Sequence, residues 1–355
     1  MLITRKYDSL GRSTGFEIGT SGDHDANYDV SYSYDSVGRF GGLETAVPSS
    51  FTATYGYVIN SNLVGTVSFP NSITATRSYE ANRDLLSAVT NTVGQTTVSQ
   101  YAYTNDAAGW SGSAFTQGSD TIAYGYNSRS EVTGATATTR TAYDFDYTYD
   151  NIGNRATYAV AGGTATTYTP PNEVNQYIVT ANPTEAFYYD DDGNLTEDGD
   201  FEYTWDAENR LTSVVAAAVV KVEFTYDYMS RRVRKVSYDR ESGNWVQQTD
   251  QKFVYDGWNP VLELASGGLL AAHLSEQVNA FVYDGNGNVS ETLRVSNGTI
   301  EAHYEYDPFG NTTYIDNQTW AAANPFRFST KYLDVETSLY YYGLRSCYVP
   351  CQTRR

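Results

Sequence analysis

The residues that most often carry out chemistry are scattered in this sequence. Its three histidines, His24, His273 and His303, lie far apart, and none stands near a sharp turn that would present a nucleophile. Nucleophilic hydrolysis therefore has no support in the sequence. We interpret the histidines as surface or sheet residues.

Candidate metal and cofactor sites are incomplete as well. The acidic run Asp190–Asn194 resembles a calcium loop but has no glutamate at the closing position, so it is better explained as a hairpin turn. The segment Gly285–Asn288 lacks the third glycine and the following helix of a phosphate-binding loop. Cys347 and Cys351, the two cysteines, have no neighbouring histidine. The sequence predicts neither a metal nor a cofactor.

Composition favours strands over helices. The chain has 355 residues, of which 33 are tyrosine, and only 18% are charged. Tyrosine has a high β-propensity and a polar tip that tolerates partial exposure. The formal net charge of −19 disfavours nucleic acid and anionic lipid as partners. We expect an all-β fold with many half-buried faces, and a short helix only at residues 267–278.

Segments for export or membrane insertion are not visible in this chain. The N-terminal residues Met1–Lys6 lack an apolar stretch, so no signal peptide is predicted. The longest apolar run, Val214–Val220, is too short to span a bilayer. Export would depend on something that this chain does not encode.

One short motif recurs along the whole chain, and it must organise the fold. It reads aromatic, Asp, two variable residues, Gly, then Arg or Asn, with degenerate copies beginning at Tyr79, Tyr126, Trp205, Tyr226 and Tyr255. The Tyr, Asp and Gly of the six clear copies are Tyr7, Asp8 and Gly11; Tyr34, Asp35 and Gly38; Tyr149, Asp150 and Gly153; Tyr189, Asp190 and Gly193; Tyr283, Asp284 and Gly287; and Tyr306, Asp307 and Gly310.

The residue types of this motif predict the tip of a β-hairpin. Asp at the first corner of a type I turn accepts hydrogen bonds from backbone N–H groups of the turn. Gly three residues later adopts positive φ at little cost, and the combination is a common hairpin loop with a bulge. The Tyr then ends the incoming strand, and the Arg or Asn begins the outgoing one.

The flanking segments have the alternation of half-buried strands. Examples are Val30–Tyr34, Phe145–Tyr149, Phe201–Trp205 and Val222–Tyr226, in which aromatic residues share one face. Stacked hairpins would align these aromatics across strands. Long gaps between copies, such as Tyr34 to Tyr79, are expected to contain degenerate copies or longer hairpins. The sequence thus predicts a strip of stacked antiparallel β-hairpins.

The motif and a C-terminal signature together resemble one protein family. Residues 1 to 345 are similar to the tyrosine-aspartate (YD) repeats of Rhs proteins, teneurins and toxin-complex C subunits. The segments Tyr304–Asn311, Asn324–Asp334 and Leu339–Arg345 resemble the Rhs repeat-associated core. The resemblance divides the chain into a YD-repeat segment, residues 1–303, a core-like segment, residues 304–345, and a divergent tail, residues 346–355.

The resemblance implies a strip that spirals as part of a β-shell, on the cell surface or outside the cell. In the family the shell encloses a C-terminal toxin or belongs to an adhesion ectodomain. The partners implied are further YD-repeat chain, a toxin cargo in longer relatives, and glycans. We expect this chain to be a truncated or orphan copy that lacks the toxin and does not close the shell.

The family's core can act as an aspartyl autoprotease, and Arg327 and Asp334 match its core positions. Such a protease needs two carboxyl groups whose pKa values are split by proximity. After Arg345 this chain departs from the family pattern, and the downstream acidic partner is missing. We therefore expect Asp334 to be a turn residue, and Asp307 likewise.

Three hypotheses remain after this reading. The first is a structural shell segment without chemistry of its own. The second is an adhesion module that binds carbohydrate through exposed aromatic residues. The third is a residual aspartyl autoprotease in the core-like segment.

Overall fold

A computed structural model of the chain describes residues 2–19, 29–45, 50–109, 111–116, 120–216, 219–266, 278–316, 319–343 and 346–348. His24, His273, Cys351 and residues 267–277 of the expected helix lie outside this set. The described elements are almost all strands, with one five-residue α-helix, α2 (Thr319–Ala323), and two short 3-10 helices, η2 (Thr141–Tyr143) and η3 (Phe328–Thr330). The predicted all-β fold of antiparallel hairpins is confirmed.

Contacts divide the chain into two compact units, and each joins an early and a late part of the chain. Unit 1 contains Met1–Gly118, Leu269–Tyr304 and Ile315–Ala322. Unit 2 contains Ser119–Gly268, Glu305–Tyr314 and Ala323–Arg355. In each unit we call the early part the strip and the late part the docked segment.

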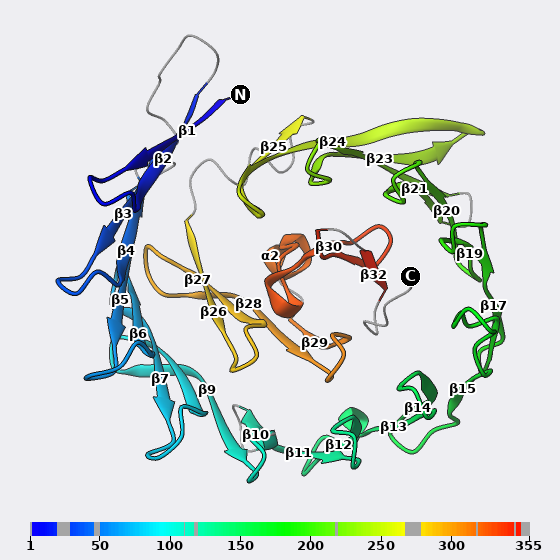
Figure 1. The fold of residues 1–355 in the computed structure, drawn as a ribbon, viewed down its shortest axis with the longest axis horizontal. Coiled ribbons are helices and arrows are strands. Elements are labelled where there is room, and N and C mark those ends of the chain that lie inside the picture. The colour runs from blue at the N-terminus through cyan, green and yellow to red at the C-terminus, as the bar shows by residue number, and fades with distance from the viewer. Residues whose placement is uncertain are drawn as a thin grey trace. The chain divides into compact units, whose positions relative to one another are not determined.

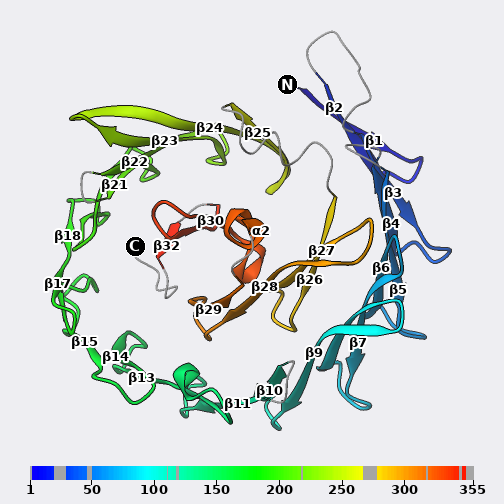
Figure 2. The same cartoon turned by 180° about the vertical axis from the view of Figure 1, so that it is seen from behind.

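The strip of unit 1 pairs each strand with the next one along the chain, antiparallel from β1 to β10, as far as the described residues show. Its docked segment forms hairpins that lie against one face of this strip (Figures 1 and 2). The strands are β1 (Leu2–Tyr7), β2 (Ser13–Gly19), β3 (Asp29–Tyr34), β4 (Phe40–Thr45), β5 (Phe51–Tyr57), β6 (Val64–Phe69), β7 (Ile73–Tyr79), β8 (Leu86–Val93), β9 (Thr96–Asn105), β10 (Ser111–Thr116), β26 (Asn279–Tyr283), β27 (Val289–Arg294) and β28 (Ile300–Tyr306).

The strip of unit 2 follows a curve, and β30 to β32 lie on its concave side (Figures 1 and 2). Its strands are β11 (Asp120–Tyr126), β12 (Val132–Ala137), β13 (Phe145–Tyr149), β14 (Arg155–Val160), β15 (Thr166–Tyr168), β16 (Val179–Ala181), β17 (Glu185–Ala186), β18 (Tyr188–Tyr189), β19 (Leu195–Glu197), β20 (Phe201–Trp205), β21 (Leu211–Ala216), β22 (Val220–Tyr226), β23 (Arg232–Glu241), β24 (Asn244–Asp256) and β25 (Asn259–Ser266). The docked segment has β29 (Thr312–Ile315), β30 (Tyr332–Asp334), β31 (Leu339–Tyr341) and β32 (Ser346–Tyr348).

Each motif ends its strand with a bulge, as the predicted loop type requires. The pairing register shifts at the motif tyrosine, for example between Lys6 and Tyr7 and between Thr148 and Tyr149. The extra residue lets the strands twist into the turn without breaking the rest of the ladder. The Tyr of the motif therefore occupies the last position of the incoming strand.

The docked segments share small apolar cores with their strips. In unit 1, Ile73 and Val98 of the strip pack with Val282 and Leu293. In unit 2, Phe253 and Tyr255 pack with Tyr332 and Tyr341, and Leu339 joins a larger cluster around Val214 and Phe224. Burying an aliphatic side chain contributes about 1.5–3 kcal/mol, so these contacts hold the late strands to the early ones. No helix among the described residues is long and apolar enough to cross a membrane.

Candidate functional site

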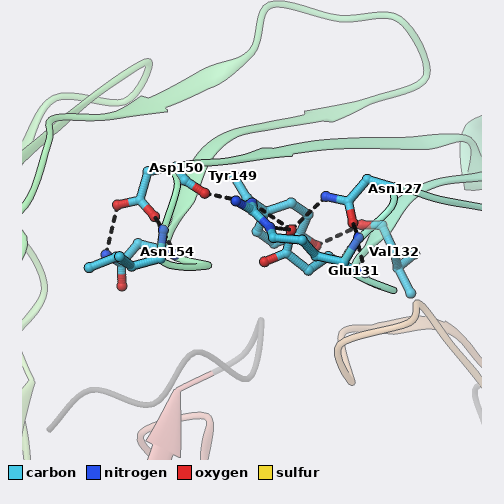
Figure 3. Close-up of polar contacts among 8 residues, drawn as sticks. Asn127, Glu131, Val132, Tyr149, Asp150 and Asn154 are labelled. Atoms are coloured by element: carbon cyan, nitrogen blue, oxygen red, sulfur yellow. Dashed lines mark hydrogen bonds and ion pairs between the residues drawn. The ribbon is translucent and has the colours of Figure 1, made fainter.

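The YD turns are closed by their own side chains. In the turn that begins at Asp150, Oδ1 accepts the N–H groups of Ile152 and Asn154, each at 2.9 Å. Oδ2 accepts Nδ2 of Asn154 at 2.8 Å (Figure 3). Gly153 has a φ of 94°. The sixth residue therefore clamps the second, which explains why it is Arg or Asn. The sequence pattern had indicated only that this residue begins the outgoing strand.

The same geometry recurs in all six clear copies. In each, the amide N–H of the Gly donates to the Asp carbonyl, and the Arg or Asn side chain bonds Oδ2 of the Asp. In degenerate copies Ser or Asn takes the positive-φ position, as Ser130, Asn209 and Ser230 do. The positive-φ glycines of the clear copies are Gly11, Gly38, Gly153, Gly193, Gly287 and Gly310.

The motif tyrosine joins one turn to the turn before it. The Tyr149 hydroxyl donates to the backbone oxygen of Val132, at 2.6 Å, and Val132 directly follows the preceding turn (Figure 3). The same joint repeats along both strips, always from the last residue before one turn to the first residue after the previous turn. The other donors are Tyr34, Tyr57, Tyr79, Asn105, Tyr189, Trp205, Tyr226 and Tyr255.

Arginine at the sixth position adds a second link in the same direction. The guanidinium of Arg12 lies 4.3 Å from the ring centroid of Tyr34, and that of Arg39 lies 4.1 Å from the Tyr57 ring. Arg231, also at the sixth position, donates to the backbone oxygen of Gly257 in the next turn, at 2.6 Å. Cation–π contacts contribute about 0.5–1 kcal/mol at exposed sites. The turns thus form a continuous ladder within each strip.

Three turns of this ladder have sequences that were not recognised as copies of the motif. They begin at Val58, Asp106 and Asn172, and the first of them occupies the long gap between Tyr34 and Tyr79. Asn172 replaces the Asp and accepts the N–H groups of Val174 and Gln176. An amide oxygen can accept the same two bonds as a carboxylate. A search for Asn at the second position, without a preceding aromatic, would have found this turn.

The environment of the turn carboxylates differs between the strips and the docked segments. Hydrogen bonds from the backbone and guanidinium of Arg12 hold the pKa of Asp8 below its ordinary value. Burial raises the pKa of Asp284 to about 6, against the bonds from Asn288, and also raises that of Asp307. The docked turns are packed against their strips: the N–H of Gly285 donates to the Tyr103 hydroxyl at 2.6 Å. Phe309 packs on Tyr147 with ring centroids 4.8 Å apart.

The core position Asp334 is the most buried charged group of unit 2. Its side chain is 0% exposed; Oδ2 accepts Nη1 of Arg232 at 2.6 Å, and Oδ1 lies 3.1 Å from Nζ of Lys235. Lys235 also pairs with Glu336 at 2.7 Å. The guanidinium of Arg232 lies 4.3 Å from the ring centroid of Tyr341. Asp334 begins a turn, with the N–H of Thr337 donating to its backbone oxygen. The sequence did not indicate its two cationic partners.

Further polar side chains extend this buried group. Gln251 donates to Glu263 at 2.6 Å and to the Tyr332 hydroxyl at 3.1 Å. Burial raises the pKa of Glu263. Arg327, the other core position, is 8% exposed, and its Nε donates to the backbone oxygen of Asn324 at 3.1 Å. Arg327 thus stabilises its own turn, whereas Asp334 forms ion pairs with the strip.

Unit 1 contains a second buried carboxylate that bonds a docked segment to its strip. Glu291 of β27 is 1% exposed and accepts Ser99 Oγ of β9 at 2.6 Å. Tyr101 of β9 also donates to it, at 3.3 Å, and the ring of His303 lies 2.9 Å away through Nδ1. These partners differ from those of Asp334, since hydroxyl groups replace the buried cations. Both carboxylates connect a late strand to an early one.

The comparisons with known proteins agree with this architecture. Residues 71–249, just over half of the chain, match the family model "Teneurin YD-shell". Among curated proteins, the chain is 31% identical over 213 residues to the tRNA3(Ser)-specific nuclease WapA of Bacillus spizizenii, and 29% identical to the tRNA nuclease WapA of Bacillus subtilis. Each alignment covers 55% of this chain, and the chain spans about a tenth (9%) of the length of these relatives.

Solved structures share the fold over almost the whole chain. The TcdB2-TccC3-Cdc42 crystal structure covers 98% of this chain with a TM-score of 0.78 and 17% identity. The Tc holotoxin pore of Photorhabdus luminescens also covers 98%, with a TM-score of 0.77. This chain corresponds to 20% and 19% of those chains. With the family model matched over half its length and the turn ladder that this fold requires, the chain belongs to the teneurin YD-shell family.

Proposed function

We propose that this chain is a structural segment of a Rhs-type shell and is not an enzyme. The observation that carries the proposal is the turn ladder. The Asp, Gly, Arg or Asn, and Tyr of successive motifs are bonded within one turn or to the adjacent turn. The residues that recur most often in the sequence thus bond the strip itself.

The core-like segment has a place in this proposal. Asp334, Arg232 and Lys235 hold β30 and β31 to the strip of unit 2, and Arg140 adds an ion pair to Glu305 of the docked segment. A buried carboxylate between two cations is suited to positioning, because removing any one partner leaves a buried charge uncompensated. The docked segments thus order the strip by packing against one of its faces.

The toxin cargo, the location outside the cell and the further YD-repeat chain are proposals that come from the family. The curated relatives are named as tRNA nucleases, and this chain matches a small part of each. We propose that a shell of this kind accompanies a toxin in longer proteins and acts outside the cell. Further YD-repeat chain is the protein partner that this reading requires.

The structural proposal is tested by breaking joints of the ladder. A Tyr149→Phe and Tyr226→Phe double variant keeps both rings and removes two hydroxyl donors. We expect faster limited proteolysis of unit 2 and a lower urea midpoint, with β-type circular dichroism retained. The matched control is Tyr228→Phe, whose side chain is 91% exposed. A double variant as resistant as the parent would contradict the proposal.

One observation favours residual autoproteolysis as a second candidate. Glu263, whose pKa is raised by burial, belongs to the buried polar group around β30 through Gln251 and Tyr332, and an aspartyl protease needs two carboxyl groups close together. Incubation of the purified chain followed by intact-mass measurement tests it. Cleavage that is lost in Asp334→Asn would support this activity; an unchanged mass would exclude it for the chain under those conditions.

Carbohydrate binding stays a prediction of the sequence. Aromatic side chains such as Tyr188 and Trp258 are 55% and 46% exposed, and glycan ligands commonly stack on exposed rings. A glycan array with the parent chain and a Trp258→Ala variant tests it. Absence of signal across the array would count against this alternative.

A further inference from the structure

Lys235 of β23 is a buried amine that lies against a buried carboxyl group. Its side chain is 2% exposed, and Nζ lies 3.1 Å from Oδ1 of Asp334, whose side chain is 0% exposed. The ion pair of Lys221 with Glu223 differs, because those side chains are 20% and 43% exposed. A buried ion pair keeps two charges out of water at a cost in free energy, whereas an amide formed from the same two groups is neutral. The two reactants of an amide bond are therefore in contact inside unit 2.

Neighbouring side chains supply the other groups that amide formation needs. Nζ of Lys235 donates to Oε2 of Glu336 at 2.7 Å, so a carboxylate is placed to take a proton from the amine. Nη1 of Arg232 donates to Oδ2 of Asp334 at 2.6 Å. Oδ1 of Asp334 accepts no hydrogen bond from any described residue. One oxygen of the carboxyl group is thus fixed by a cation, and the other, beside the amine, can leave.

We propose that Lys235 and Asp334 form an intramolecular amide (isopeptide) bond in the folded chain. Nζ of Lys235 attacks Cγ of Asp334, so that the Nζ–Cγ bond forms and the Cγ–Oδ1 bond breaks. Two of the three ammonium protons move to Oδ1, one of them through Glu336, and Oδ1 leaves as water. Arg232 stabilises the negative charge that develops on Oδ2, which becomes the amide oxygen. The reaction needs no co-reactant and takes place once in each chain.

The charges around the amide balance before and after the reaction. Two cations, Lys235 and Arg232, begin beside two carboxylates, Asp334 and Glu336. The amide removes one charge of each sign and leaves Arg232 and Glu336. Well-oriented groups of one molecule react as if each were present at about 10⁵–10⁸ M, and the fold holds these two in contact across 99 positions of the sequence. The bond would keep β23 and β30 joined even in the unfolded chain, which restricts its conformational freedom.

The intact mass of the full chain tests this directly. We expect a mass that is lower than the mass calculated from the sequence by one water molecule. Trypsin does not cleave after an amidated lysine, so digestion should release residues 235–240 and 332–345 as one branched peptide. Tandem mass spectrometry of that peptide should locate the link at Lys235 and Asp334. Lys221→Arg is the control and should keep the water loss, because it changes a lysine of an exposed ion pair.

Three further variants separate the roles of the groups. Lys235→Arg keeps the positive charge but removes the amine, so its mass should equal the calculated mass. Asp334→Asn should lose one ammonia molecule instead of water, because the side-chain nitrogen becomes the leaving group. Glu336→Gln should slow formation of the bond about a hundredfold, since the amide side chain cannot relay the proton. Circular dichroism of each variant checks that the β-fold is retained.

Two results would overturn the inference. The first is a folded parent chain whose mass stays at the calculated value after prolonged incubation at neutral pH. The second is a water loss that persists in Lys235→Arg, because a succinimide at an Asp-Gly step such as Asp198-Gly199 also releases one water. Autoproteolysis differs from both, since it would give two shorter masses. The variants Tyr149→Phe and Tyr226→Phe test the structural function separately, so an absent amide bond would leave that function standing.

Discussion

Arg232 of β23 donates to Asp334 of β30 across 2.6 Å, and neither side chain is more than 2% exposed. The two residues lie 102 positions apart in sequence. Lys235, three residues further along β23, shares the same carboxylate. This ion pair bonds a late segment of the chain to the strip of unit 2. The first prediction follows from it.

Removal of the buried carboxylate should destabilise unit 2 severely. Asp334→Ala leaves Arg232 and Lys235 buried without their counter-ion, and breaking such a pair costs about 3–5 kcal/mol. Urea unfolding followed by tyrosine fluorescence measures this loss. Hydrogen exchange at Tyr332–Asp334 should rise first. Glu208→Gln is the control, because the Glu208 side chain is 67% exposed in its pair with Arg210 and its loss should change stability by less than about 0.5 kcal/mol.

Loss of one ladder hydroxyl should cost less than loss of the buried carboxylate. Tyr226→Phe removes the donor to the Leu211 backbone oxygen, a bond of 2.7 Å, and should cost about 1 kcal/mol. Tyr228, two residues away, is 91% exposed, and Tyr228→Phe should be neutral. The difference in urea midpoint between the two variants isolates the joint. Equal midpoints would show that the hydroxyl contributes nothing.

The positive-φ position of each turn should discriminate between Gly and other residues. Gly153 has a φ of 94°, and Gly153→Ala should destabilise the hairpin by about 1–2 kcal/mol. Ser130 occupies the equivalent position of the neighbouring turn with a φ of 65°. Ser130→Gly should therefore be neutral or stabilising, despite the entropy that glycine adds to the unfolded chain. Thermal unfolding of Gly153→Ala and Ser130→Gly measures these two changes in stability.

Stability of unit 1 should increase as the pH falls from about 7 toward 5. The pKa of Asp284 is raised to about 6 by burial, above its ordinary value of 3.8. A carboxyl group with a raised folded pKa binds protons more readily in the folded state, so its favourable contribution is full below pH 3.8 and is lost as the pH rises through 6. Asp284→Asn should remove this dependence and increase stability at pH 8. Urea midpoints of parent and variant across this range measure the effect.

Asp284→Asn should keep the turn intact, because the chain has Asn at the same motif position of another turn. Asn127 accepts the N–H groups of Arg129 and Glu131 through Oδ1, as Asp284 does for Asn286 and Asn288. The control is Asp8→Asn, since the pKa of Asp8 is lowered and its folded state favours the charged form. That variant should lose stability at neutral pH. A parent chain whose stability does not vary between pH 7 and 5 would contradict the assignment to Asp284.

Much of the strip could be predicted because its determinants are local. Asp150 and Gly153 lie within four residues of each other, and turn closure depends only on groups inside that window. Degenerate turns such as that at Asn172 were missed because Asn and Gln form the same bonds with a different sequence. The joint from Tyr149 to Val132 was missed for another reason. It joins residues 17 positions apart and depends on how neighbouring hairpins pair.

The amino-acid sequence by itself determined the element type, the turn type and the family. These follow from short-range hydrogen bonding, from the conformational freedom of glycine and from the alternation of aromatic residues. The tertiary structure alone decided that Asp334 meets Arg232 and Lys235, that Glu291 meets Ser99, and that the docked YD turns pack against their strips. Those contacts join residues 99 to 192 positions apart, where no local pattern specifies the partner. Burial then gives identical motifs different acidities, because the cost of charging a carboxyl group depends on the water around it.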